Sequence, residues 1–326
     1  MTTNVLPAKL AQIEERVASA VREGLLSRPK RLPPWLFYDE AGSRLFDEIT
    51  RLPEYYLTRT ERGILAGHAG EMIARAAEGE RLRIAELGAG SADKTRLLLA
   101  AAVARQGTVL YEPVDVSATA LEAARERIER EIAGVHVAHR IEDYTHGLEL
   151  EPMDVGERRL VLYIGSSIGN FEPQEAERLL EGVRAGLREG DGLLLGVDLV
   201  KDKATLVAAY DDAAGVTAAF NLNLLARLNR ELGAEFDLKT FAHLAVWNGA
   251  ESRMEMYLES RTAQRVRVAG LDLDVDFAKG ERTHTENSYK YLPGQAKAMM
   301  AQAGFAPVES WTDEQGWFGV CLGRVG

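Results

Sequence analysis

An acidic residue followed by two glycines marks the first stretch of the chain whose residues could do chemistry. The run Glu86-Leu87-Gly88-Ala89-Gly90 follows a short apolar segment and precedes a helical pattern that starts at Thr95. A strand, a tight turn and a helix in this order form the first half of a βαβ unit, and glycines in the turn let a ligand approach the backbone. The turn lacks the third glycine and the Lys-Ser/Thr pair of phosphate-binding motifs, which disfavours a phosphate ligand.

An acidic residue at the end of the next strand narrows the choice of ligand. Asp115 follows the apolar residues 108–114, about one βαβ step after the glycine turn. In doubly wound folds an acidic side chain at this place binds ribose hydroxyls. A sulfonium nucleoside has ribose hydroxyls but no phosphate. We therefore interpret Gly88, Gly90 and Asp115 as parts of an S-adenosylmethionine (SAM) site.

Two residues after the predicted third strand lie where a loop would reach the adenine. Residues 134–141 read as that strand, and Asp143 and Tyr144 follow it. A carboxylate there can accept a hydrogen bond from the exocyclic amine. The alternative, a helix cap and a surface aromatic, stays open. His136 and His139 do not favour a metal, because a three-residue step in a strand places them on opposite faces.

The predicted fourth strand ends in a turn that fits a substrate. Residues 159–164 are apolar without alternation, as in a central parallel strand, and Gly165 to Asn170 follow. The carboxyl ends of such strands bind ligands in open α/β sheets. The Asn170 amide could contact both the amine and the carboxylate of an amino acid, although Asn170 as a left-handed turn residue remains the alternative.

The order of the helices and strands that would position these residues indicates two domains. The pattern favours an α/β fold, with a doubly wound parallel sheet completed by a C-terminal antiparallel hairpin. An α+β insertion of roughly ninety residues interrupts it after the fifth strand, residues 191–199. We expect a SAM-binding domain at 61–200 and 287–326, and a discontinuous substrate-binding domain at 1–60 and 201–286. Aromatic residues around Trp35 and Tyr55 could fasten a lid or line a pocket.

Composition excludes several classes of function. The 326 residues carry a formal net charge of −11, which disfavours a nucleic-acid partner, because phosphate contacts need clustered Lys and Arg. Cys321 is the only cysteine, so an internal disulfide and a cysteine-rich zinc site are excluded. No apolar run is long enough for a membrane span, and residues 1–10 show no signal peptide. We expect a cytoplasmic monomer without metal.

Several longer segments resemble one family, the L-histidine Nα-methyltransferases. These segments are Trp35–Asp39, Leu52–Tyr56, Gly165–Asn170, Ala209–Asn221 and Thr285–Lys290. The resemblance runs from about residue 15 to the end and implies a class I methyltransferase core with an inserted substrate domain. It implies trimethylation of histidine, through mono- and dimethyl intermediates, to hercynine in ergothioneine biosynthesis. SAM would be the methyl donor and would leave as S-adenosylhomocysteine.

The resemblance also implies roles for individual residues. It places Tyr38, Asn170 and Tyr210 at the reacting amine, with the last two contacting the amino and carboxylate groups. Tyr55, Glu286 and Ser288 would face the imidazole. The remaining assignments are to SAM (Gly88, Lys94, Asp115, Asp143 and Tyr144) and to the pocket wall (Phe46 and Met256, beside Tyr38). One departure is Tyr144, where a phenylalanine is also usual.

Two other functions remain open from the sequence. The same scaffold could methylate another aromatic amino acid of the tryptophan type, although Glu286 opposes this because an indole has a single donor. A regulatory module that binds SAM without chemistry is the second alternative. The presence of Asn170, Tyr210 and Glu286 disfavours it.

Overall fold

The computed structural model describes residues 5–90, 92–116, 118–142, 144, 150 and 152–326. The chain forms two compact units, Met1–Tyr55 with Asp202–Asn287 (unit 1) and Tyr56–Lys201 with Ser288–Gly326 (unit 2). The domain borders expected after residues 60, 200 and 286 lie near the unit borders after 55, 201 and 287. The first border differs most because a helix, α3 (Tyr56–Ala77), begins there.

Unit 2 contains one mixed sheet with helices on both faces. Its strands are β2 (Arg81–Leu87), β3 (Val109–Asp115), β4 (Val135–Val137), β5 (Arg140–Ile141), β6 (Glu157–Tyr163), β7 (Gly192–Asp198), β13 (Phe305–Thr312) and β14 (Phe318–Val325). Its other helices are α4 (Thr95–Gln106), α5 (Ala118–Glu131), the 3-10 helix η3 (Ser167–Asn170), α6 (Pro173–Ala185) and α9 (Gln295–Gln302).

The strand order of this sheet is β13-β14-β7-β6-β2-β3-β4, and β5 also pairs with β3. Neighbours from β7 to β4 are parallel, whereas β14 runs antiparallel to both β7 and β13. The predicted doubly wound parallel sheet with an antiparallel C-terminal hairpin is confirmed. The expected third strand is divided into β4 and β5, which both pair with β3.

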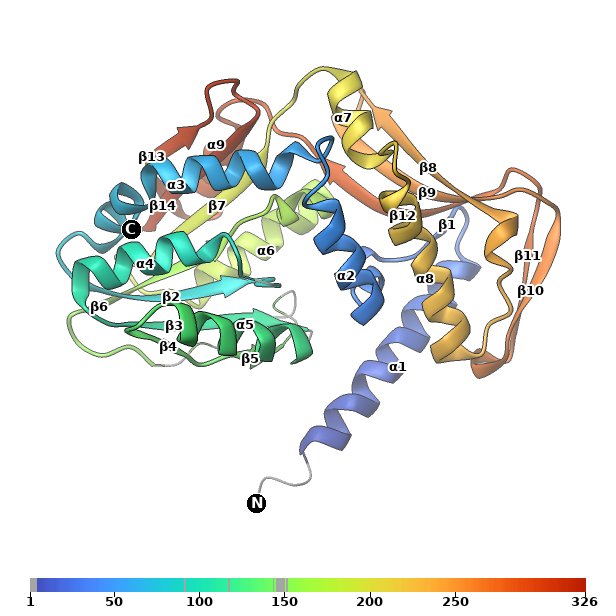
Figure 1. Ribbon diagram of the computed structural model, residues 1–326, viewed down its shortest axis with the longest axis horizontal. Coiled ribbons are helices and arrows are strands. Elements are labelled where there is room, and N and C mark those ends of the chain that lie inside the picture. Colours follow the sequence, from blue (N-terminus) through green and yellow to red (C-terminus); the bar gives the residue numbers. More distant parts are fainter. Residues whose placement is uncertain (1–4, 91, 117, 143, 145–149, 151) are drawn as a thin grey trace. The chain divides into compact units, whose positions relative to one another are not determined.

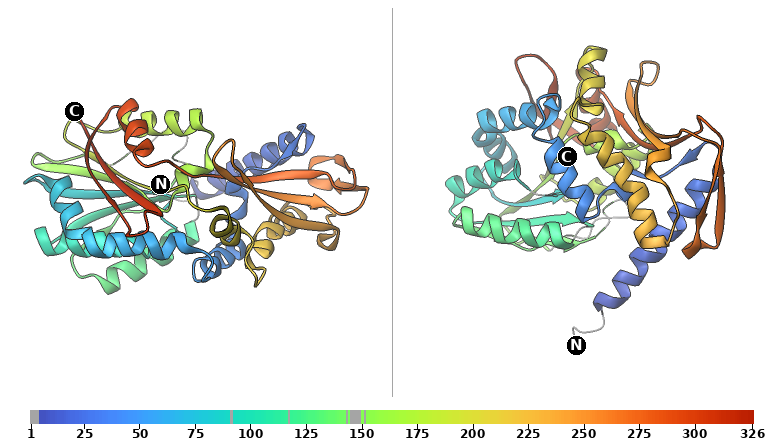
Figure 2. Two further views of the ribbon diagram at one scale, coloured as in Figure 1. Left: turned by 90° about the horizontal axis from the view of Figure 1, so that it is seen from above. Right: turned by 45° about the vertical axis from the view of Figure 1, so that its right-hand side comes forward.

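Alternating apolar residues bury both faces of the sheet. On β6, Leu160 and Leu162 pack in one core cluster with α3, α4 and α5, while Val161 and Tyr163 pack in the other with α6 and α9. The two groups of helices lie on opposite faces of the sheet (Figures 1 and 2). Because β2, β3, β6 and β7 are parallel, their carboxyl ends form one edge of the sheet.

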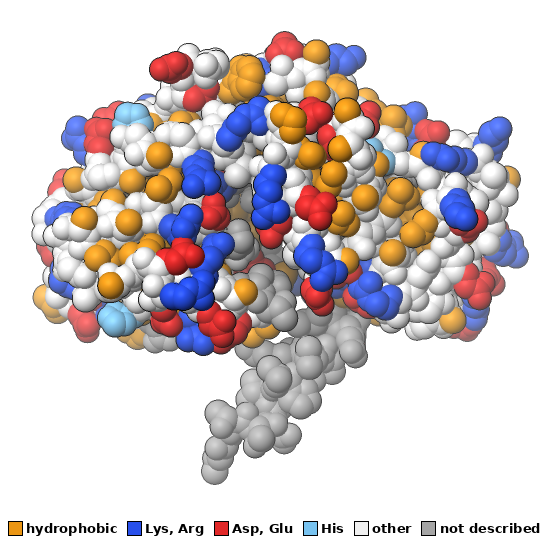
Figure 3. Space-filling view, in the orientation of Figure 1, with side chains coloured by type: hydrophobic (Ala, Val, Ile, Leu, Met, Phe, Trp, Pro, Cys, Tyr) orange, Lys and Arg blue, Asp and Glu red, His pale blue; other side chains and the backbone are white. Residues whose placement is uncertain are grey.

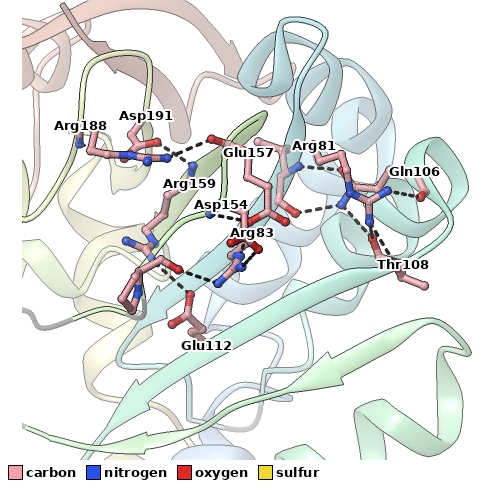
Figure 4. Close-up of polar contacts among 12 residues, drawn as sticks. Arg81, Arg83, Gln106, Thr108, Glu112, Asp154, Glu157, Arg159, Arg188 and Asp191 are labelled. Atoms are coloured by element: carbon pink, nitrogen blue, oxygen red, sulfur yellow. Dashed lines mark hydrogen bonds and ion pairs between the residues drawn. The ribbon is translucent and has the colours of Figure 1, made fainter.

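At the opposite end of the parallel strands, where they begin, charged side chains join neighbouring strands (Figure 4). Arg83 binds Glu157 at 2.6 Å and Asp154 at 3.0 Å, which ties β2 to the start of β6. The Asp191 carboxylate accepts the N–H of Arg159 at 2.8 Å and so joins β6 to the start of β7. These contacts hold the amino ends of the strands, so we give them a structural role.

Unit 1 is an α+β unit with a four-stranded sheet and a separate hairpin. Its strands are β1 (Lys30–Arg31), β8 (Phe241–Asn248), β9 (Arg253–Ser260), β10 (Gln264–Val268), β11 (Leu273–Phe277) and β12 (Arg282–Tyr289), which runs two residues into unit 2. Its helices are α1 (Val5–Leu26), η1 (Pro34–Phe37), α2 (Glu40–Ile49), α7 (Lys203–Tyr210), α8 (Val216–Leu232), η4 (Leu238–Thr240) and η5 (Ala269–Leu271).

The four-stranded sheet has the order β1-β12-β9-β8, and β10 pairs with β11. Helices α7 and α8 both contact β8 and β9. Helix α2 starts at Glu40, because the Asp39 carboxylate caps it by accepting the Gly42 N–H at 2.6 Å. Strand β12 was not expected from the sequence.

Charged side chains of both signs lie beside one another on the face drawn in Figure 3. Ion pairs among the described residues include Arg230 with Asp39 in unit 1 and Arg96 with Glu131 in unit 2. Among the described residues, no helix has the length and the apolar character needed to cross a membrane.

Candidate functional site

The glycine turn after β2 is shaped by two residues with left-handed backbone. Gly88 has φ +66° and Gly90 has φ +50°. The Gly88 N–H donates to the carbonyl oxygen of Val114 at 2.9 Å, which fixes the turn against the end of β3. A Cβ at Gly88 would lie 3.3 Å from the hydroxyl oxygen of Tyr144, so glycine allows this ring to lie over the turn.

Asp115 lies at the end of β3 and contacts the same turn. Its carboxylate accepts the N–H of Gly90 at 3.0 Å. The next residue, Val116, is an apolar side chain that is 40% exposed. The structure thus brings Gly88, Gly90, Asp115 and Tyr144 together at one edge of the sheet. Asp143 lies outside the described residues.

Glu86, the acidic residue of the glycine motif, holds together the elements that flank the turn. The Glu86 carboxylate is buried and accepts hydrogen bonds from the Thr95 hydroxyl at 2.7 and 2.8 Å and from the Tyr111 hydroxyl. Burial raises the pKa of Glu86 to about 7, against the lowering effect of these hydroxyls. Glu86 therefore ties the start of α4 to β2 and β3.

A second buried carboxylate, Glu61 on α3, links the predicted cofactor and substrate turns. Its side chain is fully buried and forms an ion pair with Lys94, the residue immediately before α4. The other oxygen of Glu61 accepts the N–H of Gly165, at the turn after β6, at 2.8 Å. Glu61 could not be singled out from the sequence, because it lies 33 residues before Lys94 and in a helix without a clear apolar periodicity.

The turn after β6 carries Asn170 and packs against the end of β12. Ser166 adopts φ +60°, and η3 ends at Asn170. A Cβ at Gly169 would lie 2.9 Å from the backbone oxygen of Tyr289, so only glycine fits this close approach. Ser288, the neighbour of Tyr289, is 4% exposed. The turn and Ser288 thus belong to one packed region of unit 2.

In unit 1, four aromatic residues predicted to bind substrate form a continuous cluster. The ring centroids of Tyr38 and Phe46 are 5.7 Å apart, and those of Phe46 and Tyr55 are 6.2 Å apart. Tyr55 in turn lies 6.5 Å from Tyr210. All three pairs have edge-to-face geometry, which is favourable for aromatic rings. Residues from α2, the segments flanking it and the end of α7 therefore meet.

A half-buried histidine, which no sequence motif indicated, holds the end of α7. His243 Nε2 lies 2.8 Å from the carbonyl oxygen of Tyr210, and its Nδ1 lies 2.9 Å from the amide nitrogen of Asn221. Neutral imidazole satisfies both bonds, with the proton on Nε2. Burial lowers the pKa of His243, against the opposing effect of the Tyr210 carbonyl.

Met256 and Glu286 lie on the neighbouring strands β9 and β12. The hydroxyl of Thr285 donates to the carbonyl oxygen of Met256 at 3.1 Å, which fixes the strands at this level. Met256 is 2% exposed and Glu286 is 8% exposed. Within the described residues, no cluster of His, Cys, Asp and Glu could hold a metal ion.

The predicted site residues therefore fall into two sets, one within each unit. Unit 1 holds Tyr38, Phe46, Tyr55, Tyr210, Met256 and Glu286. Unit 2 holds Gly88, Gly90, Lys94, Asp115, Tyr144, Gly165, Asn170 and Ser288.

The chain resembles known proteins over most of its length. Residues 17–325 match a family described as histidine-specific, SAM-dependent methyltransferase. The chain is 49% identical over 308 residues to histidine N-alpha-methyltransferase of Mycolicibacterium smegmatis, covering 94% of each chain. It is 31% identical over 296 residues to ergothioneine biosynthesis protein 1 of Neurospora crassa, covering 87% of this chain and 32% of that protein. It is 30% identical over 323 residues to 4-dimethylallyltryptophan N-methyltransferase of Arthroderma benhamiae, covering 95% of this chain and 94% of that one.

Proposed function

Because the chain belongs to the histidine-specific, SAM-dependent methyltransferase family, we propose that it transfers three methyl groups to the α-amine of L-histidine. The product would be histidine betaine, the first intermediate of ergothioneine biosynthesis. Mono- and dimethylhistidine would be the intermediates. We further propose that unit 2 binds SAM and that unit 1 supplies most of the histidine contacts.

The residues at the carboxyl edge of the unit 2 sheet fit SAM. The proposed contacts are the backbone of Gly88 and Gly90, the Lys94 ammonium, the Asp115 carboxylate at the ribose, and Asp143 and Tyr144 at the adenine. Asp115 already accepts a backbone N–H at 3.0 Å, which orients its carboxylate. The exposed Val116 offers an apolar surface beside it. SAM supplies an electrophilic methyl group and leaves as S-adenosylhomocysteine.

The proposed histidine contacts divide between the two ends of the amino acid. Asn170 and Tyr210 would bind the amino and carboxylate groups, with Tyr38 near the amine and Gly165 in the turn beside it. Tyr55, Glu286 and Ser288 would bind the imidazole, between Phe46 and Met256. The observation that carries this proposal is the cluster of Tyr38, Phe46, Tyr55 and Tyr210, because it assembles the predicted aromatic residues from separate segments.

The chemistry requires a neutral amine placed in line with the sulfonium methyl group. Positioning two reactants in this way can lower the barrier by several kcal/mol, so the protein needs no strong acid or base at the methyl group. Aromatic faces are attracted to cationic amines, which suits a site that must accept an increasingly methylated nitrogen. An amine held by an amide and by tyrosine hydroxyls, without a fixed carboxylate, can rotate to accept each new methyl group.

Mass spectrometry of products from the twenty amino acids, each incubated with SAM, tests this proposal. We expect histidine to gain the mass of three CH2 units, because each transferred methyl group replaces a proton, and we expect little reaction with the other amino acids. A preference for tryptophan would support the tryptophan-type alternative. The Arthroderma benhamiae relative is named as a methyltransferase for a tryptophan derivative.

Thermal unfolding separates catalysis from a regulatory module that only binds SAM. An enzyme should be stabilised by SAM or S-adenosylhomocysteine, and further by histidine, because each ligand binds the folded state. Stabilisation by SAM with no increment from histidine would favour the regulatory alternative.

A further inference from the structure

The buried carboxylate of Glu61 lies between two turns of unit 2 that carry proposed ligand-binding residues. Its Oε2 atom forms the ion pair with the ammonium of Lys94, immediately before α4. Its Oε1 atom accepts the N–H of Gly165, after β6, at 2.8 Å. Gly196 on β7 leaves room for this group, because a Cβ at Gly196 would lie 2.3 Å from Oε1. The fold therefore provides a fitted position for the carboxylate.

The two contacts of Glu61 depend on each other. Its side chain is 0% exposed, and burying a carboxylate costs free energy unless the group is paired and hydrogen-bonded. Glu61 meets this need with one donor 33 residues along the chain and another 104 residues along it. Loss of either donor would leave part of the negative charge unpaired in the interior. A movement of one donor is therefore felt by the other through the shared carboxylate.

Lys94 can contact a ligand while it stays paired with Glu61. Its side chain is 20% exposed, and an ammonium group has three hydrogens to donate. The only anionic group of SAM is the carboxylate of its methionine part, so charge assigns the proposed Lys94 contact to that group. A Cβ at Gly165 would lie 3.3 Å from Lys94 Nζ, which places the ammonium against the predicted substrate turn as well.

The turn from Gly165 to Asn170 is braced by further hydrogen bonds. The carbonyl oxygen of Ser166 accepts the N–H of Gly169 at 2.9 Å, and the 3-10 helix η3 ends at Asn170. The Ser166 hydroxyl accepts the N–H of Asp198, the last residue of β7, at 2.9 Å. Because the turn is braced in this way, the position of the Gly165 N–H affects the position of Asn170.

We propose that Glu61 is a positioning residue that couples the binding of SAM to the binding of histidine, by holding the Lys94 ammonium and the Gly165 turn in one arrangement. This inference rests on the proposed function, in which Lys94 contacts SAM and the turn contacts histidine. Glu61 itself contacts neither ligand. A ligand carboxylate that fixes Lys94 also fixes Glu61 and the turn, so each ligand binds more tightly when the other is present.

Calorimetry with S-adenosylhomocysteine, which has no methyl group to transfer, measures this coupling directly. In the wild type, S-adenosylhomocysteine should raise the affinity for histidine about tenfold, and histidine should raise the affinity for S-adenosylhomocysteine by the same factor. In Glu61→Gln the factor should fall close to one, because an amide has a single acceptor oxygen and cannot hold both donors. A factor of one in the wild type, or an unchanged factor in Glu61→Gln, would overturn the proposal.

Glu86→Gln is the matched control. It also removes a buried carboxylate beside the start of α4, but the oxygens of Glu86 accept from the hydroxyls of Thr95 and Tyr111. A purely structural role would weaken the binding of both ligands without changing the factor between them. The factor should therefore stay about tenfold in Glu86→Gln. Its loss in both variants would show a general effect of buried charge and would refute the specific role of Glu61.

A ligand analogue tests the same coupling in the wild-type protein, in case Glu61→Gln does not fold. Decarboxylated S-adenosylhomocysteine lacks the group that Lys94 is proposed to bind. At saturation it should leave the affinity for histidine near the value without cofactor, whereas S-adenosylhomocysteine should raise that affinity about tenfold. Equal enhancement by the two compounds would show that the coupling does not pass through Lys94 and Glu61, which would contradict the proposal.

The failure of the proposed function would look different. If the wild-type protein binds S-adenosylhomocysteine but methylates no histidine, the function itself is wrong. If histidine is methylated and the coupling factor does not depend on Glu61, only the role of Glu61 is wrong.

Discussion

At the scale of single residues, Asp115 has two roles that substitutions can separate. Its carboxylate accepts the N–H of Gly90, and it is proposed to accept from the ribose hydroxyls. Asp115→Ala removes both contacts and should weaken SAM binding by about 1.5–3 kcal/mol, because a charged acceptor is lost. Asp115→Asn keeps an oxygen that can accept the Gly90 N–H, so it should lose only part of this SAM-binding free energy. Calorimetry showing unchanged affinity in Asp115→Ala would exclude Asp115 from the SAM site.

Specificity for the ring is proposed to depend on Glu286, which is 8% exposed on β12. Glu286→Ala should lower kcat/KM for histidine by roughly one to two decades, since a charge-assisted hydrogen bond is lost. Relative activity on tryptophan should rise, because a buried carboxylate no longer opposes an apolar ring. Glu259→Ala on the adjacent strand is the control and should keep the wild-type ratio. An unchanged histidine-to-tryptophan ratio in Glu286→Ala would contradict the assignment.

The buried carboxylate of Glu86 should make stability depend on pH. Burial raises its pKa in the folded state from 4.5 to about 7. A raised pKa means that the folded state holds the proton more tightly. Its contribution to the free energy of unfolding is therefore complete below pH 4.5 and is lost as the pH rises through about 7. In the wild type, the free energy of unfolding should fall by on the order of 3 kcal/mol between pH 4.5 and 8 because of Glu86. Glu86→Gln should not show this fall when denaturant unfolding is followed over the same pH range. Parallel curves for the two proteins would refute it.

At the scale of elements, His243 ties the end of α7 to β8 and should stay neutral. Its pKa in the folded state is below the ordinary 6.5, chiefly through burial. A lowered pKa means that the stability His243 contributes is present above pH 6.5 and is lost as the pH falls through the folded-state pKa. We expect His243→Gln to be less sensitive to acid than the wild type in thermal unfolding. His68→Gln on α3 is a control, because His68 is 43% exposed. Equal acid sensitivity in wild type and His243→Gln would contradict this role.

The elements that the sequence predicted well are those whose burial is uniform or strictly periodic. The apolar runs of β2, β3, β6 and β7 were predicted within a few residues. Helix α3 was missed because three glycines interrupt it and buried residues lie around much of its circumference. Strand β12 was missed because its residues are mostly polar, and only pairing with β1 and β9 makes it a strand.

The site could be predicted only as far as contacts follow local sequence. The turn at Gly88 and Gly90 and the position of Asp115 follow from βαβ order, which sequence reveals. Glu61 and Asp198 could not be found in this way. Glu61 contacts Lys94 and Gly165, which lie 33 and 104 residues away in the chain, and Asp198 contacts Tyr56, which lies 142 residues away. Only the folded sheet therefore shows that these carboxylates join distant segments.

At the scale of the whole molecule, the account divides the work between two units. We propose that unit 2 supplies the SAM residues at the carboxyl ends of its parallel strands, and that unit 1 supplies aromatic and acidic side chains for histidine. The division is consistent with the family, whose match covers segments of both units. It also explains why both glycine-turn and aromatic segments are needed for the proposed reaction.

The central claim is that histidine is trimethylated on its α-nitrogen. The direct measurement is NMR of the product formed from histidine and excess SAM carrying a ¹³C-labelled methyl group. The account predicts one methyl signal from three equivalent groups on the α-nitrogen, with an unmodified imidazole ring. A product that stops at one methyl group, or that carries a methyl group on a ring nitrogen, would contradict it.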